Sequence, residues 1–358
     1  MDITFLGTGS AYPSPNRCAS SLIFRNDGEC WMFDCGEGTQ IQLQRSIIRA
    51  GRITKVFITH LHGDHLYGLP GFLNTISFGT IEEREPIELY GPTGLRRYVR
   101  TSMDISRSQL NYPLIINELQ ITDDMLPEDW TDWQSNYEST EPQHPSEQPG
   151  RTITKDENGI WNIFENETFI VQAAPLKHRV PTFGYIVREK DQPGSLNAKH
   201  LKDLGVPAGP LYGKLKKGES ITTPDGTVVR PEDAVGPPKP GRKIAFLWDT
   251  YDASLAAPLL QDVDVMVHEA TMENEMKEKC VLNGHSTPEM AGEFARSVCA
   301  KKLIITHFSQ RYKTSSDNEE DEPTTTKLLL QAKEAFQSDN VVAAADLLTV
   351  SIPSLSLR

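Results

Sequence analysis

The sequence lacks the features of a membrane or secreted protein. No window approaches the roughly 18 apolar residues that a membrane-spanning helix requires. The first residues, MDITFLGTGSAYPSP, contain no basic segment followed by an apolar one, so we expect no secretory signal. We therefore predict a protein of the cytoplasm, the nucleus or both, with no membrane contact.

Cysteine is scarce, and its pattern argues against a disulfide framework. The 358 residues include five cysteines, an odd number, and none of them forms a CxxC pair. Small domains that depend on disulfides usually carry an even number of cysteines at close spacing. Reduced thiols, as in cytosolic or nuclear proteins, fit this pattern better.

Positive charge is in deficit, since the net charge is −13, and this at first argues against a nucleic-acid partner. The excess acid is concentrated, however. Residues 108–150 hold nine acidic side chains and residues 314–326 hold five, and neither segment contains Lys or Arg. Without these 14 charges the chain would carry about +1. We interpret both segments as solvated acidic loops, and the remainder can still present basic patches.

Short apolar runs rich in β-branched and aromatic residues alternate with helical patterns in both halves of the chain. Strands are predicted at 2–7, 21–25, 30–36, 55–60 and 87–92, then at 168–176, 183–189, 243–249, 264–270 and 302–308. Helices are predicted at 39–48, 94–103, 286–298 and 324–336. The runs VFITH and LIITH, at 56–60 and 303–307, both end on a histidine, which suits a fold of two similar halves.

Two segments interrupt this pattern. Residues 127–151 are polar and acidic, and we interpret them as an insertion. Residues 190–241 are rich in Gly and Pro, with one helical piece at 195–205. Long segments of this kind within a compact domain are usually functional or disordered. From Arg188 to Lys217 there are seven basic and three acidic side chains, so this arm is locally positive.

The stretch FITHLHGDH places four potential metal ligands within six positions after an apolar strand. His60 and His62 are two residues apart, so an extended backbone projects both to one side. Gly63 permits a turn, after which Asp64 and His65 can face a neighbouring position. Ligands divided in this way suit two metal ions better than one.

Two metal sites need further ligands, and these should follow other strands. His178 follows a predicted strand, Asp249 and His307 each lie at the end of one, and His285 lies just before a predicted helix. Taken alone, each has an ordinary interpretation as a loop histidine or a turn carboxylate. The first motif, however, requires partners of this kind at strand ends.

The motif THLHGDH resembles the HxHxDH signature of the metallo-β-lactamase superfamily. Its surroundings resemble one family more closely, ribonuclease Z, the tRNA 3′-processing endonuclease, in its short form. The resemblance runs from residue 3 to about residue 350 and is carried by TFLGTGSAYPSP, FDCGEGTQ, ITHLHGDHLYGLPG, PTFGYIV, GPLYGKLKKG, VMVHEAT, GHSTPEMA and IITHFSQRY.

This resemblance implies an α/β fold, the metallo-β-lactamase αββα sandwich of two β-sheets flanked by helices, with a protruding flexible arm. Residues 1–358 would form one such domain, with the arm at 190–215 and the acidic insertion at 127–151. Trp248 departs from the family, in which many members have glycine before the aspartate that corresponds to Asp249. We expect the bulky indole to alter that turn or to pack behind the site.

The resemblance also implies a dinuclear zinc site with two ions per subunit, bridged by Asp249. His285 would protonate the leaving group, supported by Glu269, and with Asp64 these two form the expected catalytic set. Asp34 would orient ligands without touching metal. His268, which precedes Glu269, is interpreted as structural. One ion would be held by His60, His62 and His178, and the other by Asp64, His65 and His307.

The implied activity is removal of 3′ trailers from precursor tRNA by attack of a metal-bridging hydroxide. The products would be a tRNA with a 3′-hydroxyl and a trailer with a 5′-phosphate. The arm would grip tRNA, and a homodimer is expected. The alternatives are another hydrolase of this fold, such as a thioesterase, lactamase, sulfatase or other phosphodiesterase, and a non-catalytic binding scaffold. The arm residues expected to bind RNA are Lys199, Lys202, Lys214, Lys216 and Lys217.

Overall fold

The computed structural model describes residues 1–79, 84–127, 130, 142–223, 226–313 and 324–354. The chain divides into two compact units. Much of the acidic segments at 127–151 and 314–326 lies outside the described residues. Unit 1 comprises Met1–Glu165, Val171–Val187 and Lys243–Ile352, and unit 2 comprises Asn166–Ile170, Arg188–Arg242 and Pro353–Arg358.

Among the described residues, nine strands form the first sheet of unit 1, in the order β18-β1-β2-β3-β4-β5-β6-β7, with β8 also paired to β6. Strands β3 to β6 run parallel, so their carboxyl ends meet at one edge. The strands are β1 (Asp2–Gly7), β2 (Ser21–Asn26), β3 (Glu29–Phe33), β4 (Ile53–Phe57), β5 (Ile87–Pro92), β6 (Leu114–Leu119), β7 (Glu147–Gln148), β8 (Thr152–Ile153) and β18 (Thr349–Ser351).

The second sheet has the order β17-β16-β15-β14-β11-β10-β9. Strands β14 to β17 are parallel, as in the first sheet. Each half of the chain therefore supplies one edge at which loops from parallel strands converge. The strands are β9 (Trp161–Glu165), β10 (Phe169–Leu176), β11 (Thr182–Glu189), β14 (Lys243–Leu247), β15 (Val265–Glu269), β16 (Leu303–Thr306) and β17 (Val341–Ala343).

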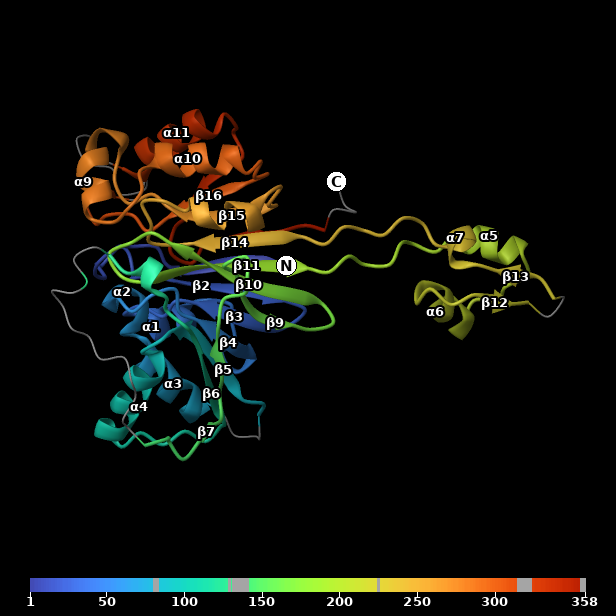
Figure 1. The fold of residues 1–358 in the computed structure, drawn as a ribbon, viewed down its shortest axis with the longest axis horizontal. Coiled ribbons are helices and arrows are strands. Elements are labelled where there is room, and N and C mark those ends of the chain that lie inside the picture. The colour runs from blue at the N-terminus through green and yellow to red at the C-terminus, as the bar shows by residue number, and fades with distance from the viewer. Residues whose placement is uncertain (80–83, 128–129, 131–141, 224–225, 314–323, 355–358) are drawn as a thin grey trace. The chain divides into compact units, whose positions relative to one another are not determined.

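Helices cover the outer faces of both sheets (Figure 1), which gives the layer order helix, sheet, sheet, helix. On the first sheet lie α1 (Thr39–Arg45), α3 (Leu69–Gly79) and α4 (Leu95–Ser106), with the one-turn α2 (Gly63–Leu66) after β4. On the second sheet lie α10 (Pro288–Ser297) and α11 (Thr325–Phe336), with α8 (Ala257–Leu260) and α9 (Lys277–Leu282) nearby. Short 3-10 helices occur at Ala50–Arg52, Asp123–Met125, Ser254–Ala256 and Asn274–Met276.

Aromatic side chains fill the space between the two sheets. The Phe33 ring stacks on Phe57 of the neighbouring strand at 4.7 Å and on Phe246 of the second sheet at 4.0 Å. The Tyr185 hydroxyl donates to the carbonyl of Ile58 at 2.8 Å, so this buried polar group is satisfied. Aliphatic clusters pack between each sheet and its helices. These contacts fix the two converging edges relative to each other.

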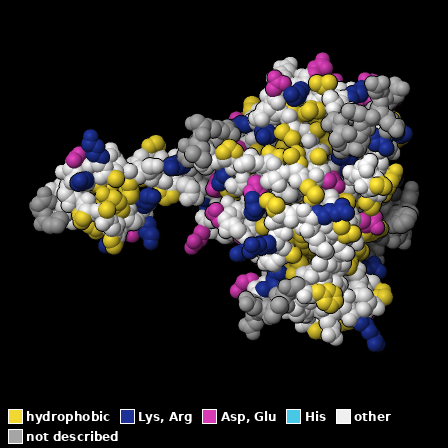
Figure 2. Space-filling view, turned by 180° about the vertical axis from the view of Figure 1, so that it is seen from behind, with side chains coloured by type: hydrophobic (Ala, Val, Ile, Leu, Met, Phe, Trp, Pro, Cys, Tyr) yellow, Lys and Arg dark blue, Asp and Glu magenta, His cyan; other side chains and the backbone are white. Residues whose placement is uncertain are grey.

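Unit 2 has a small core of its own, built on Leu201, Val206 and Leu215. The predicted helix at 195–205 is shorter in the structure, because Asn197 caps it by accepting from the His200 N–H at 3.0 Å. Figure 2 shows Lys and Arg side chains on the visible face of this unit. Its elements are α5 (Ala198–Asp203), α6 (Pro210–Lys216), α7 (Pro231–Ala234), β12 (Ile221–Thr222) and β13 (Val228–Val229).

Two general properties accord with the sequence. All five cysteines are free thiols. Within the ranges that the structure describes, no helix combines the length and the apolar character needed to cross a membrane.

Candidate metal centre

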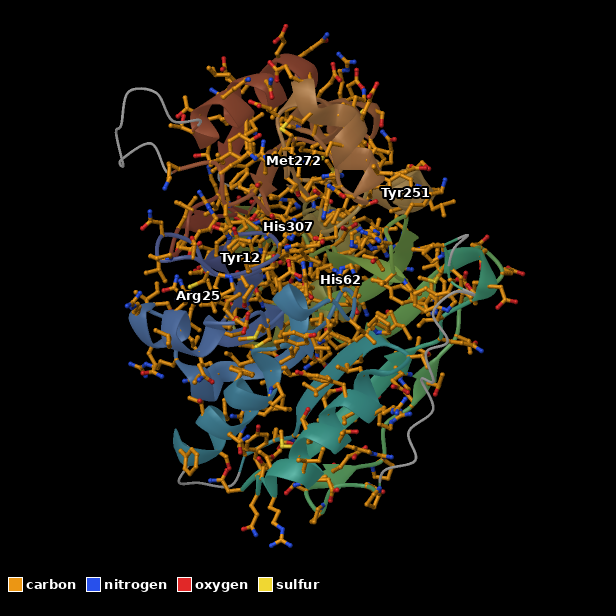
Figure 3. The ribbon with its side chains drawn as sticks, turned by 90° about the vertical axis from the view of Figure 1, so that its left-hand side faces the viewer. Tyr12, Arg25, His62, Tyr251, Met272 and His307 are labelled. Carbon is orange, nitrogen blue, oxygen red and sulfur yellow. The ribbon has the colours of Figure 1, made fainter. Side chains whose placement is uncertain are left out.

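The seven predicted ligands meet where the two sheets converge. The first four follow β4, and Asp64 and His65 lie within the short helix α2. The other three come from loops after β10, β14 and β16 of the second sheet. Figure 3 shows His62 and His307 at the boundary between the two halves of unit 1. Two groups composed of these ligands have ligand atoms within 4.8 Å of one another, namely His60, His62, His178 and Asp249, and Asp64, His65, Asp249 and His307; a third such group joins Asp249 and His307 to Glu269 and His285.

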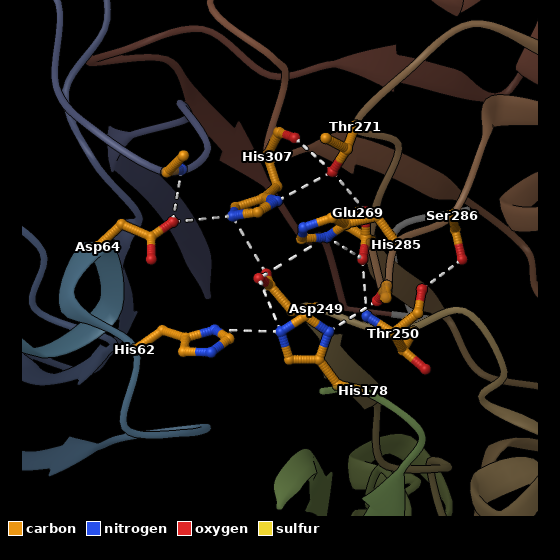
Figure 4. Close-up of polar contacts among 12 residues, drawn as sticks. His62, Asp64, His178, Asp249, Thr250, Glu269, Thr271, His285, Ser286 and His307 are labelled. Carbon is orange, nitrogen blue, oxygen red and sulfur yellow. Dashed lines mark hydrogen bonds and ion pairs between the residues drawn. The ribbon is translucent and has the colours of Figure 1, made fainter. Parts of the chain in front are cut away.

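In the first group, three imidazole nitrogens face one another. Nδ1 of His62 lies 3.0 Å from Nε2 of His60 and 3.1 Å from Nε2 of His178 (Figure 4 shows the second contact). Nδ1 of His178 donates to the Gly284 carbonyl at 2.7 Å, and Nδ1 of His60 contacts the Thr59 hydroxyl at 3.0 Å. The protons therefore lie on the outer nitrogens, and lone pairs point inward.

Burial keeps the histidines of this first group uncharged. It lowers the pKa of His178 to about 4 and holds the pKa of His60 well below its ordinary value. A neutral imidazole with an inward lone pair is the form that binds a metal ion. Several inward lone pairs repel one another unless a cation lies between them.

The second group is built around carboxylates. Nε2 of His65 and Nε2 of His307 lie 3.3 Å apart, and each is within 3.5 Å of Oδ2 of Asp64. Nδ1 of His65 bonds to the buried carboxylate of Asp34 at 2.6 Å, so Nε2 again faces inward. Burial disfavours charge on His65, but Asp249, Asp64 and Asp34 outweigh it and raise its pKa well above the usual range. A cation that binds here displaces a proton.

Asp249 belongs to both groups. Its Oδ2 lies 3.6 Å from Nε2 of His60 and of His178, and its Oδ1 lies 3.1 Å from Nε2 of His307. The side chain is buried, and Oδ1 has no hydrogen-bond partner among the described residues. A buried carboxylate oxygen of this kind is costly unless a cation satisfies it. The orphaned oxygen, the inward lone pairs and the purely N and O donor set fit two zinc ions that share Asp249.

Beside the metal groups lies a histidine–carboxylate pair. Nδ1 of His285 is 3.1 Å from Oε1 of the buried Glu269. Burial disfavours charge on His285, but Glu269 and Asp249 outweigh it and raise its pKa to about 9. The imidazole is therefore protonated near neutral pH and can release a proton.

Sequence reasoning missed two threonines that hold this arrangement together. The Thr59 hydroxyl lies between Asp34 and His60, and the Thr271 hydroxyl lies between Glu269 and His307. Thr59 precedes a ligand in the HxHxDH motif, and Thr271 ends the HEAT box, so both stand beside recognised residues. No spacing rule marks their hydroxyl contacts, which span different strands.

The remaining predicted residues lie outside the metal groups. His268 is buried, with Nδ1 bonded to the Glu269 carbonyl at 2.7 Å. Trp248 packs behind the site, with its ring 6.4 Å from that of Phe246. The predicted RNA-binding lysines are exposed on or beside helices α5 and α6 of unit 2, at positions Lys199, Lys202, Lys214, Lys216 and Lys217.

Comparison with known proteins gives full-length similarities. The chain is 46% identical over 359 residues to the zinc phosphodiesterase ELAC protein 1 of Bos taurus, covering 99% of each chain. It is 39% identical over 315 residues to the ribonuclease Z of Bacillus licheniformis, covering 87% of this chain and 89% of the relative. In addition, residues 1–104 match the family model described as Anti-Pycsar protein Apyc1.

Solved structures show the same similarity in three dimensions. The crystal structure of human tRNase Z, short form (ELAC1), superposes with a TM-score of 0.69 at 36% identity, covering 99% of this chain and 100% of that one. The metallo-β-lactamase fold protein YhfI of Bacillus subtilis superposes with a TM-score of 0.54 at 14% identity, covering 98% of each chain. The predicted metallo-β-lactamase fold is therefore confirmed.

Proposed function

Because the chain belongs to the ribonuclease Z family, we propose that it is a zinc-dependent endoribonuclease that removes 3′ trailers from precursor tRNA. Membership makes it a phosphodiester-hydrolysing ribonuclease; the substrate and mechanism are the proposal. The observation that carries it is the shared carboxylate of Asp249 between two inward-facing ligand groups, with a protonated histidine alongside. This geometry suits cleavage of a phosphodiester with a poor leaving group.

Each part of the site would have a separate role. When bound, two zinc ions would supply the positive charge that ionises a water molecule and neutralises the phosphodiester. Asp64 and Asp249 would complete the ligand groups. His285 would give a proton to the leaving 3′ oxygen, and Glu269 would hold Nδ1 of that imidazole so that the other nitrogen faces the substrate. The products would be a 3′-hydroxyl on the tRNA and a 5′-phosphate on the trailer.

Binding of tRNA would rely on unit 2. Its lysines at 199, 202, 214, 216 and 217 are all exposed, so their ammonium groups can reach a phosphate backbone. Contacts of this type hold phosphates and carry little sequence information, so recognition would depend on tRNA shape. The net charge of −13 disfavours binding to RNA, and unit 2 would supply the positive surface that offsets it.

We also propose that the protein forms a homodimer through the face formed by α1 and α3. Ile41 is 53% exposed, Ile47 is 70% exposed and Phe78 is 90% exposed. Ile41 lies in α1, Ile47 shortly after it and Phe78 near the end of α3, and exposed large apolar side chains of this kind are available to an interface. The free cysteines support a location in the cytoplasm or the nucleus, where thiols stay reduced.

Cleavage of a 3′-extended precursor tRNA with end-mapping tests this proposal. We expect a single cut at the trailer junction, lost on chelation and restored by zinc. A thioester and a β-lactam, offered in parallel, should not be turned over. Rapid turnover of either one, without cleavage of the RNA, would favour another hydrolase of this fold.

A further inference from the structure

The Thr271 hydroxyl occupies the junction between the predicted metal ligands and the predicted proton donor. Its Oγ1 lies 2.5 Å from Oε2 of Glu269 and 3.0 Å from Nδ1 of His307 (Figure 4). Thr271 is buried, and so are both partners. Water therefore cannot substitute easily for either contact.

The number of protons fixes the direction of these bonds. A hydroxyl has one proton and accepts through its lone pairs, whereas a carboxylate only accepts. Two acceptors face the Thr271 hydroxyl, Oε2 of Glu269 at 2.5 Å and the backbone carbonyl of His307 at 3.0 Å, and the shorter, charged contact with Glu269 takes its proton. Nδ1 of His307 must then carry a proton and donate it to Oγ1, which leaves the lone pair of His307 on Nε2, facing Asp64 and Asp249.

The other oxygen of the same carboxylate serves the proton donor. Oε1 of Glu269 accepts from the Thr250 N–H at 2.6 Å and lies 3.1 Å from Nδ1 of His285. Glu269 is thus held on one oxygen by Thr271 and on the other by the loop that follows β14. One continuous series of hydrogen bonds joins His307 to His285.

The first half of the chain contains the same arrangement. The Thr59 hydroxyl donates to Oδ2 of Asp34 at 2.8 Å and lies 3.0 Å from Nδ1 of His60. Asp34 in turn holds Nδ1 of His65. Each half therefore has a buried carboxylate, a threonine hydroxyl and two imidazoles in one order. In the first half both imidazoles are in the metal groups, whereas in the second half the carboxylate holds His285.

We propose that Thr271 is a positioning residue that sets His307 and the Glu269–His285 pair with one hydroxyl. By accepting a hydrogen bond from Nδ1 of His307, the hydroxyl oxygen leaves Nε2 of that ring to face the metal site. Its donor side fixes the carboxylate that orients His285. The inference rests on the proposed function for the role of His285, but the effect on metal binding is independent of the substrate.

The chain provides a matched control one residue before His307. Thr306 is fully buried, and its hydroxyl has no hydrogen-bond partner among the described residues. Thr306→Val, at the end of β16, and Thr271→Val, in the loop after β15, make the same isosteric change from hydroxyl to methyl. Only the second removes a bonded hydroxyl, and Thr271→Ser restores it.

The experiment compares these three variants with the wild type by three measurements. They are zinc affinity by chelator competition, kcat on precursor tRNA, and kcat on bis(p-nitrophenyl) phosphate, whose aryl leaving group needs no proton. For Thr271→Val we expect zinc affinity to fall about 10- to 100-fold, the usual effect of losing a hydrogen bond to a ligand. Its kcat should fall more on RNA than on the aryl ester.

Thr271→Ser should regain the wild-type zinc affinity and the wild-type kcat on RNA. Thr306→Val should keep both of these values. The proposal is overturned if Thr271→Val retains wild-type zinc affinity, or if it loses kcat equally on both substrates once saturated with zinc. It is also overturned if Thr306→Val shows the same losses. If wild-type protein fails to cleave precursor tRNA, the proposed function fails, while the zinc affinities still decide the role of Thr271 at His307.

Discussion

Oε1 of Glu269 lies 3.1 Å from Nδ1 of His285, and the carboxylate is fully buried while the imidazole is partly exposed. The pair therefore holds a proton at the rim of the metal site. Burial alone would lower the pKa of His285. The negative charge of the Glu269 carboxylate outweighs this effect and raises the pKa of His285 to about 9.

The first prediction concerns Glu269→Gln. Removing the negative charge lowers the pKa of His285 toward its ordinary value of 6.5, because burial is then less opposed. The proton donor must be charged, so wild-type cleavage of RNA should decline as pH rises through the pKa of His285, which Glu269 raises. The variant should decline at a lower pH. A pH profile of kcat measures this, and an unshifted alkaline limb with full zinc content would contradict it.

The second prediction concerns Asp249→Ala. It removes the carboxylate common to both ligand groups, so we expect zinc content well below two per chain and no detectable cleavage. The exposed Asp104 of α4 offers the same change of side chain away from the site, and Asp104→Ala should bind zinc normally. Metal analysis after gel filtration checks both. A fully loaded, active Asp249→Ala variant would refute the bridging role.

The third prediction concerns unit 2. Replacing Lys199 and Lys202 by alanine should weaken precursor tRNA binding and reduce the slope of log K against log salt by about 1 for each phosphate that is no longer neutralised. The KM for a small phosphodiester should not change. Lys333→Ala, on α11 of unit 1, removes one positive charge away from unit 2 and should leave RNA binding intact. Equal RNA affinity in all three proteins would argue against unit 2 as the RNA-binding surface.

The fourth prediction concerns Phe78 in α3. Replacing this 90% exposed side chain by aspartate should cost the folded chain little, because it packs against little. In the proposed dimer it would bury a charge at the interface, so the mass in solution should fall to the 40.0 kDa of one chain. Sedimentation measures this. A wild-type protein of 40.0 kDa at micromolar concentration would rule out the dimer.

Most of the fold follows from local patterns, but several predicted strands end earlier in the structure, and two of these ends have a clear cause. The strand predicted at 30–36 ends at Phe33, because Asp34 adopts a left-handed backbone with φ of 57°. The strand predicted at 302–308 ends at Thr306, because His307 has φ of 60°. Both residues lie within runs that continue to look like strand. Their conformations serve contacts with other strands, which a single apolar run does not reveal.

The site divides in the same way. The seven candidate ligands are predicted from the HxHxDH motif, from residues at strand ends and from the family resemblance, and the structure brings them together. The threonines are not, as the runs VFITH and LIITH demonstrate. Thr59 and Thr306 occupy the same place in these runs, but Thr59 bonds to Asp34 while the Thr306 hydroxyl has no partner in the described part of the chain. In the second half Thr271, from the loop after β15, makes the corresponding bonds.

Four of the seven candidate ligands follow β4 of the first sheet, and the other three lie in loops of the second sheet. Bound ions would therefore cross-link the two sheets on either side of the aromatic layer around Phe33 and Phe246. Free zinc at 100 times its Kd would add about 2.7 kcal/mol for a single site. Zinc depletion in a cell would then shorten the lifetime of the protein as well as abolish its activity, because the metal-free protein unfolds more often and is exposed to proteases.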